Sequence, residues 1–233
     1  MPSIRQLKKL QALSGLIFGV FLVMHLLTHY SLNLGWDTAH SYQQLFRRIY
    51  QHPRVEIVIF GSLVVHMYSN TMIYIYRGKL AADKKEGTAP EKISLELKGH
   101  RYAGYFLAFS IFGHVAATRI GPMFIMDDAS EYDYGFISKA NELLPSNLFL
   151  GYLVVLGATG VWHLIYGTRS AIATLRGKSV MGTKFPISLK MVALTSHILI
   201  ISACLALGGF YYTVDLETKT ELHDKLFSAM GMH

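Results

Sequence analysis

The chain has 233 residues, of which 52% are hydrophobic and only 16% are charged, and it carries a formal net charge of +7. Its mean hydropathy is positive, at +0.31. This composition argues against an ordinary soluble domain and predicts an integral membrane protein.

Five stretches are long and apolar enough to cross a bilayer, which takes about 20 mostly apolar residues per helix. The first follows a short basic segment but shows no small-residue cleavage site, so we expect it to be retained rather than removed as a signal peptide. The third is the shortest. The five expected spans are Leu13–Leu32, Val55–Tyr76, Tyr102–Ile120, Leu148–Ile172 and Leu189–Tyr212. The remaining tail, Thr213–His233, predicts a short amphipathic helix at the membrane surface.

Basic residues are divided unequally between the two sides of these spans. Fourteen Lys and Arg residues lie on the side of the N-terminus and six on the opposite side, where the acidic run 127–133 also falls. Because basic connections stay on the cytoplasmic side, this predicts the N-terminus inside and the C-terminus outside. The net charge then reflects topology, with the lipid bilayer as the partner of the basic face. Nothing in the pattern indicates nucleic acid binding.

Four of the spans place a histidine far from their ends: His25, His66, His114 and His163. An imidazole among lipid and apolar side chains is costly, so it normally faces a partner, a cavity or a cofactor. Haem iron takes axial imidazoles from facing helices, and two such haems need four of them. The lone Cys204 leaves no motif for covalent attachment. The sequence therefore predicts two non-covalently held haem b groups.

An internal repeat supports the same prediction. Gly15 precedes His25 by ten residues, Gly104 precedes His114 by ten, and in each case the next span supplies a second histidine. Both halves then close on the tripeptide Arg-Gly-Lys. The chain is therefore expected to be all-α, a single transmembrane domain with a five-helix bundle built from a duplicated two-helix unit and a fifth helix. The expected parts are about 8–79, 99–178, and a fifth helix with its tail at 187–233.

The depth of the histidines predicts which two share one iron. At about 1.5 Å per residue, His25 and His114 fall in the outer half of their spans, whereas His66 and His163 fall at or beyond the midpoint toward the inside. The expected pairs are therefore His25 with His114 and His66 with His163.

The other histidines have less specific expectations. His29, one turn beyond His25, could compete as a ligand but has no counterpart in the repeat. His197, in the fifth span, is expected to be a hydrogen-bond donor or a neighbour of a quinone. Solvated imidazoles are expected at the positions that lie near the faces or in loops: His29, His40, His52, His100, His223 and His233.

Arg119 and Arg169 follow their nearest histidines by five and six residues and are candidates for binding haem propionates, with anchoring at the membrane surface as the alternative. The glycines of the first four spans would admit a porphyrin, or simply allow close helix packing. Trp36, Asp37 and Glu56 lie near an outer face where a quinone could dock.

No metalloprotease helix, phosphate-binding glycine loop or nucleophile elbow occurs. The sequence therefore predicts no catalytic residue.

Four segments together resemble the five-helix, di-haem cytochrome b anchor of succinate dehydrogenase and fumarate reductase. They are KKLQALSGLIFGVFLVMHLLTH, RVEIVIFGSLVVHMYSN, HRYAGYFLAFSIFGHVAATR and GATGVWHLIYG, and they cover most of residues 8–178. The resemblance implies that His25, His66, His114 and His163 are axial ligands, paired between helices one and three and between helices two and four. It also implies iron-sulfur and flavoprotein partner subunits near Lys84, Lys85, Lys92 and Lys98, a quinone substrate, and a bacterial inner or mitochondrial membrane.

The second half is also similar to the mitochondrial adapter transmembrane family known from fungi, through HRYAGYFLAFSIFGH, DDASEYDYGFIS and GVWHLIYG. That resemblance implies a role in lipid homeostasis and recruitment of a lipid-transfer protein, with haem structural or absent. A third alternative is a helical bundle without haem, whose histidines hydrogen-bond across helices.

Overall fold

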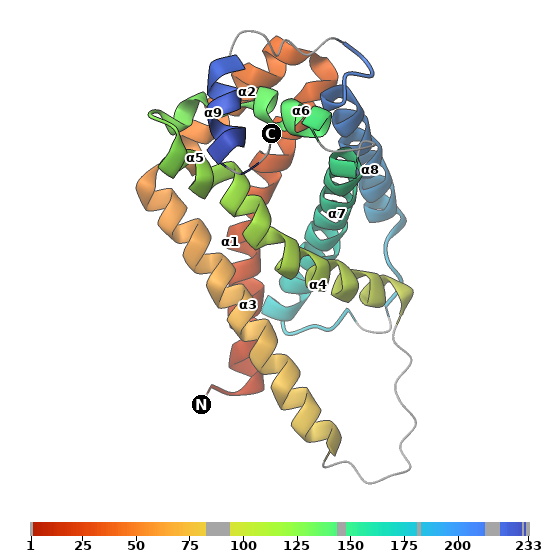
Figure 1. The fold of residues 1–233 in the computed structure, drawn as a ribbon. Coiled ribbons are helices and arrows are strands. Elements are labelled where there is room, and N and C mark those ends of the chain that lie inside the picture. The colour runs from red at the N-terminus through yellow and green to blue at the C-terminus, as the bar shows by residue number, and fades with distance from the viewer. Residues whose placement is uncertain are drawn as a thin grey trace.

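The computed structural model describes residues 2–82, 94–143, 148–180, 183–212, 220–229 and 231. Throughout this part of the chain the regular structure is helical and no strand occurs, as predicted (Figure 1). Five long helices carry the fold: α1 (Ile4–Tyr30), α3 (Pro53–Ala82), α4 (Leu95–Val115), α7 (Leu148–Leu175) and α8 (Ile187–Leu207).

All five predicted spans are confirmed as helices long and apolar enough to cross a membrane. The third was expected to be the shortest, but it is 31 residues long, from Leu95 to Ile125. The hydroxyl of Ser94 caps its start by accepting from the Leu97 amide at 3.2 Å, and a π-helical segment, Ala116–Ile120, continues it into α5 (Gly121–Ile125). Polar residues flanking the apolar run therefore extend this helix instead of ending it.

Local sequence also sets the ends of α1 and α7. Ser3 and Gln6 form a reciprocal capping box at the start of α1, with bonds of 2.7 and 3.3 Å. At the end of α7, Gly177 adopts φ +72° and the Lys178 amide donates to the Ala173 carbonyl at 2.8 Å. A side chain at Gly177 would be strained in this left-handed turn, which glycine adopts freely.

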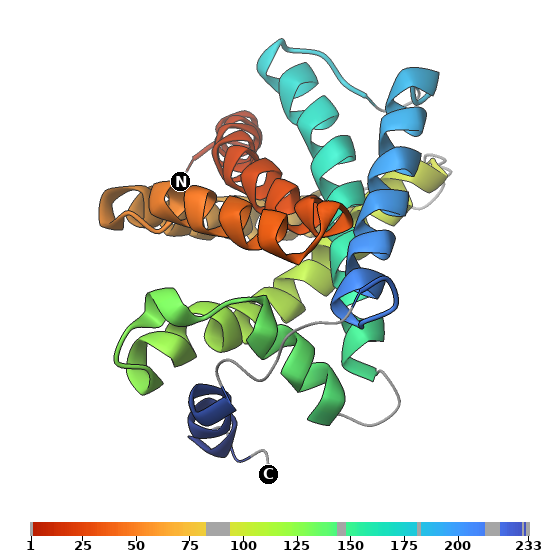
Figure 2. The same cartoon turned by 90° about the horizontal axis from the view of Figure 1, so that it is seen from above.

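The long helices pack in the order of the expected hairpins. α1 contacts α3 within the first half, α4 contacts α7 within the second, and the α1–α7 contact joins the halves, with α8 packed on α7 (Figures 1 and 2). Many apolar side chains remain exposed on the outer faces; Phe109 of α4 is 86% exposed. Such surfaces suit contact with lipid.

Shorter helices gather at the end of the bundle opposite the N-terminus: α2 (Trp36–Tyr50), α5, α6 (Tyr134–Leu143) and α9 (Thr220–Ala229) (Figure 1). α2 and α6 lie in segments that the sequence analysis treated as connections.

The helix expected in the tail is present at α9, while 213–219 lies outside the described residues. Phe227 of α9 is buried against Met126, Tyr132 and Phe136. At Phe227 the expectation of a helix resting on lipid is therefore wrong, because the neighbouring segments supply an apolar surface.

If all five candidate helices cross the membrane, the start of the first and the residues after the last lie on opposite sides of it. Arg5 and Tyr211 are exposed, and the only cysteine, Cys204, is buried. In a Cys204→Ala background, Arg5→Cys and Tyr211→Cys should each react with a membrane-impermeant maleimide from one side only, and from opposite sides. Labelling of both from the same side would contradict five spans.

Candidate haem site

Two pairs of histidines face one another inside the bundle. The ring centroids of His25 on α1 and His114 on α4 are 5.9 Å apart, with an interplanar angle of 72°. Those of His66 on α3 and His163 on α7 are 6.3 Å apart, at 88°. The structure thus brings together the same pairs that the depth argument selects. Whether they bind haem stays a prediction.

The separation of each pair fits two axial ligands of one metal ion. With metal–nitrogen bonds of about 2 Å, imidazole rings on opposite sides of an ion have centres roughly 6 Å apart. Within the described ranges, no group of three or more His, Cys, Asp or Glu side chains is arranged to hold a metal ion by itself. Two opposed imidazoles suit an ion whose remaining positions are filled by a planar ligand, as in haem.

In the inner pair, helix carbonyls fix the orientation of both imidazoles. His66 Nδ1 lies 3.0 Å from the Gln11 carbonyl oxygen, and His163 Nδ1 lies 3.2 Å from the His100 carbonyl oxygen. A carbonyl only accepts, so Nδ1 is the donor in both contacts. The proton therefore sits on Nδ1 and the Nε2 lone pair is available to a metal, which is the tautomer that ligating histidines usually have.

Glycines allow these carbonyls to come close to the histidines. A Cβ atom at Gly15 would lie 2.9 Å from His66 Nδ1, and one at Gly104 would lie 2.9 Å from His163 Cε1. Both distances are too short for a real Cβ contact, so close approach of the histidine explains these two glycines. Gly157 instead faces Ile200 of α8, where a Cβ would lie 2.5 Å from Ile200 Cγ1. At that position helix packing is the explanation.

The same contacts recur in both halves of the chain. In α1 the Gln11 carbonyl accepts a hydrogen bond from the histidine of the next long helix, His66. Gly15, four residues after Gln11, has no side chain and so leaves room for the His66 ring. In α4 His100 and Gly104 have the same spacing and the same roles. His25 and His114 each lie ten residues beyond their glycine, so the two pairs are separated by about 15 Å along the helices.

Each pair has a third imidazole beside it. Nε2 of His29 lies 3.2 Å from Nε2 of His25, while the buried Nδ1 of His25 has no hydrogen-bond partner within the described part of the chain. The His100 ring stacks on His163 with centroids 4.2 Å apart. The expectation of a solvated imidazole is wrong at both His29 and His100. His29 lines the cavity beside His25. His100 is inside the bundle because α4 begins at Leu95. His197 bonds the Ala193 carbonyl of its own helix at 2.6 Å, as expected for a hydrogen-bond donor.

One cavity of about 590 Å³ contains both histidine pairs and the third imidazole beside each of them. It lies between α1, α3, α4 and α7, reaches α2 and α6 at its outer end, and has a volume within the usual range for bound organic ligands. Its lining includes six histidines: His25, His29, His66, His100, His114 and His163.

The two arginines proposed for propionates differ in position. Arg119 lines the cavity and forms a two-point ion pair with Glu56. Its Nε donates to Oε1 at 2.5 Å and its Nη2 donates to Oε2 at 2.9 Å. Arg169 donates to the Thr183 hydroxyl at 2.6 Å and to the Lys184 carbonyl at 3.1 Å, and it lines a different groove. The structure therefore brings Arg119 to the histidines but does not bring Arg169.

Helix α2 supplies cavity residues that the sequence analysis missed. Arg47 is only 8% exposed, donates to the Tyr132 carbonyl and lies over the Tyr132 ring at 5.6 Å. Gln43, one turn earlier, has a buried Oε1 with no partner in the described ranges. Arg47 is one of the six Lys and Arg residues expected on the outer side of the membrane. The amphipathic pattern of 36–50, which follows Gly35, could have predicted a helix with these residues on its inner side.

The outer end of the cavity is also lined by neutral phenols. Burial raises the pKa of Tyr132 to about 12 and raises the pKa of Tyr134 as well. Both side chains therefore keep their protons at physiological pH. Of the residues considered for a quinone, Trp36 packs against the buried cluster around Tyr134, and Glu56 is the partner of Arg119.

No protein-family model matches the chain, and comparison with curated proteins and with solved structures gives no match. Both resemblances therefore remain expectations.

The glycine contact gives a test that does not depend on any cofactor. Gly104→Ala should lower the free energy of unfolding by about 1–3 kcal/mol, because the new methyl group overlaps His163. Gly113→Ala on the same helix is the matched control, since a Cβ there meets nothing within 4 Å. It should be neutral or slightly stabilising. Thermal unfolding in detergent measures both, and equal midpoints would contradict the proposed close approach.

Proposed function

We propose that this protein is a haem b-binding membrane cytochrome subunit that passes electrons within the bilayer. The observation that carries the proposal is the presence of two opposed histidine pairs, with ring centroids 5.9 and 6.3 Å apart, in one cavity. When bound, haem supplies one-electron redox chemistry, which no side chain in the cavity offers alone.

His66 and His163 are the proposed axial ligands of the inner site. Their Nδ1 atoms donate to the Gln11 and His100 carbonyls, which increases the electron density at Nε2 and fixes both ring planes. His100 stacks on His163 and further limits its rotation. The inner site is thus the more rigid of the two.

His25 and His114 are the proposed ligands of the outer site. His29 contacts His25 through Nε2, so it must turn away when His25 binds a metal, or take its place. Arg47 is the proposed partner of a propionate there, because it is a buried cation that lines the cavity. Arg119 is the second candidate, although Glu56 already balances its charge.

Partner subunits follow from the proposed respiratory role. An iron-sulfur subunit with its flavoprotein would dock on the face that carries the N-terminus, near Lys98, and electrons would pass through the two sites to a quinone. Lys84, Lys85 and Lys92, which the sequence analysis assigns to the same docking face, lie outside the described residues. The proposed orientation has this face inside, in keeping with the basic residues on it.

Haem quantitation tests the proposal. The detergent-purified protein should contain two haems b per chain by pyridine-haem assay, and His114→Ala and His163→Ala should each remove one. His197→Ala, on α8 outside the cavity lining, should retain both. His29→Ala should also retain both if His25 is the ligand. Absence of haem, or equal haem content in all variants, would overturn the proposal.

Redox titration tests the role of Arg47. Arg47→Gln removes a buried positive charge beside the outer site. Loss of this charge favours the oxidised form of the haem, so the reduction potential of one haem should fall by roughly tens of millivolts. Arg48→Gln on the same helix is the control, because Arg48 is exposed and its charge is screened by water. If the two variants give the same potentials, Arg47 does not interact with that site.

Isolation of the native complex separates the respiratory role from the adapter role. Haem-containing protein that co-purifies with iron-sulfur and flavin subunits supports the respiratory proposal. Haem-containing protein that purifies without them, but with a lipid-transfer protein, would replace it with the adapter role.

A further inference from the structure

A second groove, outside the histidine cavity, lies between α1, α7 and α8 and has a volume of about 850 Å³. Its walls are mostly apolar and partly open to the lipid, since Val20 is 64% exposed and Val192 is 51% exposed. At one end it closes where Leu26, Val161 and Ile200 form a buried cluster. The groove therefore has this buried cluster at one end.

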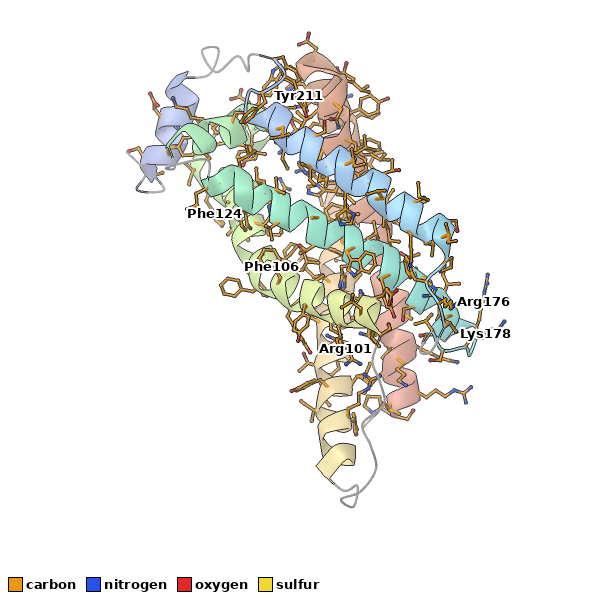
Figure 3. All side chains as sticks on the ribbon, turned by 90° about the vertical axis from the view of Figure 1, so that its right-hand side faces the viewer. Arg101, Phe106, Phe124, Arg176, Lys178 and Tyr211 are labelled. Carbon is orange, nitrogen blue, oxygen red and sulfur yellow. The ribbon has the colours of Figure 1, made fainter. Side chains whose placement is uncertain are left out.

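The opposite end of the groove is basic. Arg169, Arg176 and Lys178 line it, and no acidic side chain occurs among its lining residues in the described part of the chain. The left-handed turn at Gly177 places Arg176 and Lys178 together just beyond α7. Figure 3 shows both side chains extending from that end of the bundle, where Arg101 also lies, while Phe124 and Tyr211 lie toward the other end.

Arg169 is held in place at the same end. Its NH2 group donates to the Thr183 hydroxyl and the Lys184 carbonyl, and its guanidinium lies 5.2 Å from the centre of the Phe185 ring. Both acceptors are neutral, and none of the described residues that line the groove carries a carboxylate. The positive charge of Arg169 is therefore not neutralised within the groove lining. Three cations therefore face one mouth, next to a long apolar surface.

We propose that this groove binds one anionic phospholipid. The phosphate group lies at Arg176 and Lys178, with Arg169 below them, and an acyl chain lies along Val20, Val23 and Val192. The groove-lining residues of α1 extend from Leu16 to Tyr30, which is about 21 Å of helix and exceeds the roughly 15 Å of hydrocarbon in one leaflet. A whole acyl chain therefore fits along it.

Charge complementarity selects an anionic lipid over a zwitterionic one. A choline group would bring a fourth positive charge to the mouth, whereas a phosphatidylglycerol headgroup adds none. The proposal is independent of haem, because none of the described residues that line this groove is a histidine.

Native mass spectrometry of the full-length protein, titrated with phosphatidylglycerol or with phosphatidylcholine of the same chains, tests the headgroup site. One phosphatidylglycerol should bind about tenfold more tightly than phosphatidylcholine. The double variant Arg176→Glu/Lys178→Glu should lose this preference, while Arg101→Glu, on the same side but outside the groove, should keep it. Equal affinity for the two lipids, or retained preference in the double variant, would overturn the proposal.

A second pair of variants tests the apolar part of the site. Val20→Trp fills the groove and should weaken both lipids, whereas Val64→Trp, on the exposed face of α3, should weaken neither. Inorganic phosphate at millimolar concentration should not displace the lipid. Displacement by phosphate alone, or equal effects of the two tryptophan variants, would show that the groove does not hold an acyl chain.

Discussion

The cost of holding an imidazole away from water organises the interior of this protein. Six histidines line one cavity inside the membrane-spanning bundle, and each ring nitrogen needs a partner there. Helix carbonyls satisfy Nδ1 of His66 and His163, but Nδ1 of His25 and of His100 are buried without partners in the described ranges. Buried polar atoms of this kind require a water, an ion or a ligand as their partner.

The duplication explains how two similar sites arise in one chain. In each half, one helix carries a carbonyl that bonds the histidine of the following long helix and, four residues later, a glycine that leaves room for that histidine. The first helix also carries a histidine of its own, ten residues beyond the glycine. The α1–α7 contact then brings the halves together. Each pair takes one histidine from each half, so neither half could form a pair alone.

Hydropathy and depth were sufficient to predict the spans and the two pairs. Both depend only on spacing along helices that must cross a fixed thickness of hydrocarbon, and this spacing is visible in one sequence. His100 and Arg47 could not be placed in the same way. The burial of His100 depends on α4 beginning at Leu95, before the apolar run, and the burial of Arg47 depends on how α2 folds over the bundle, which is a tertiary feature. Arg169 shows the reverse error, since its distance along the chain from His163 suggested proximity but its side chain is held by Thr183 and Lys184.

The imidazole planes of the two pairs lie at 72° and 88° to each other. If each pair holds one haem iron as proposed, both haems would have nearly perpendicular axial rings. Electron paramagnetic resonance of the oxidised protein tests this proposal most directly, because the line shape of low-spin ferric haem depends on the angle between the axial rings. We expect two low-spin signals, both of the strongly anisotropic type with a single low-field feature. A high-spin spectrum, or the rhombic three-line spectrum of parallel imidazoles, would contradict it.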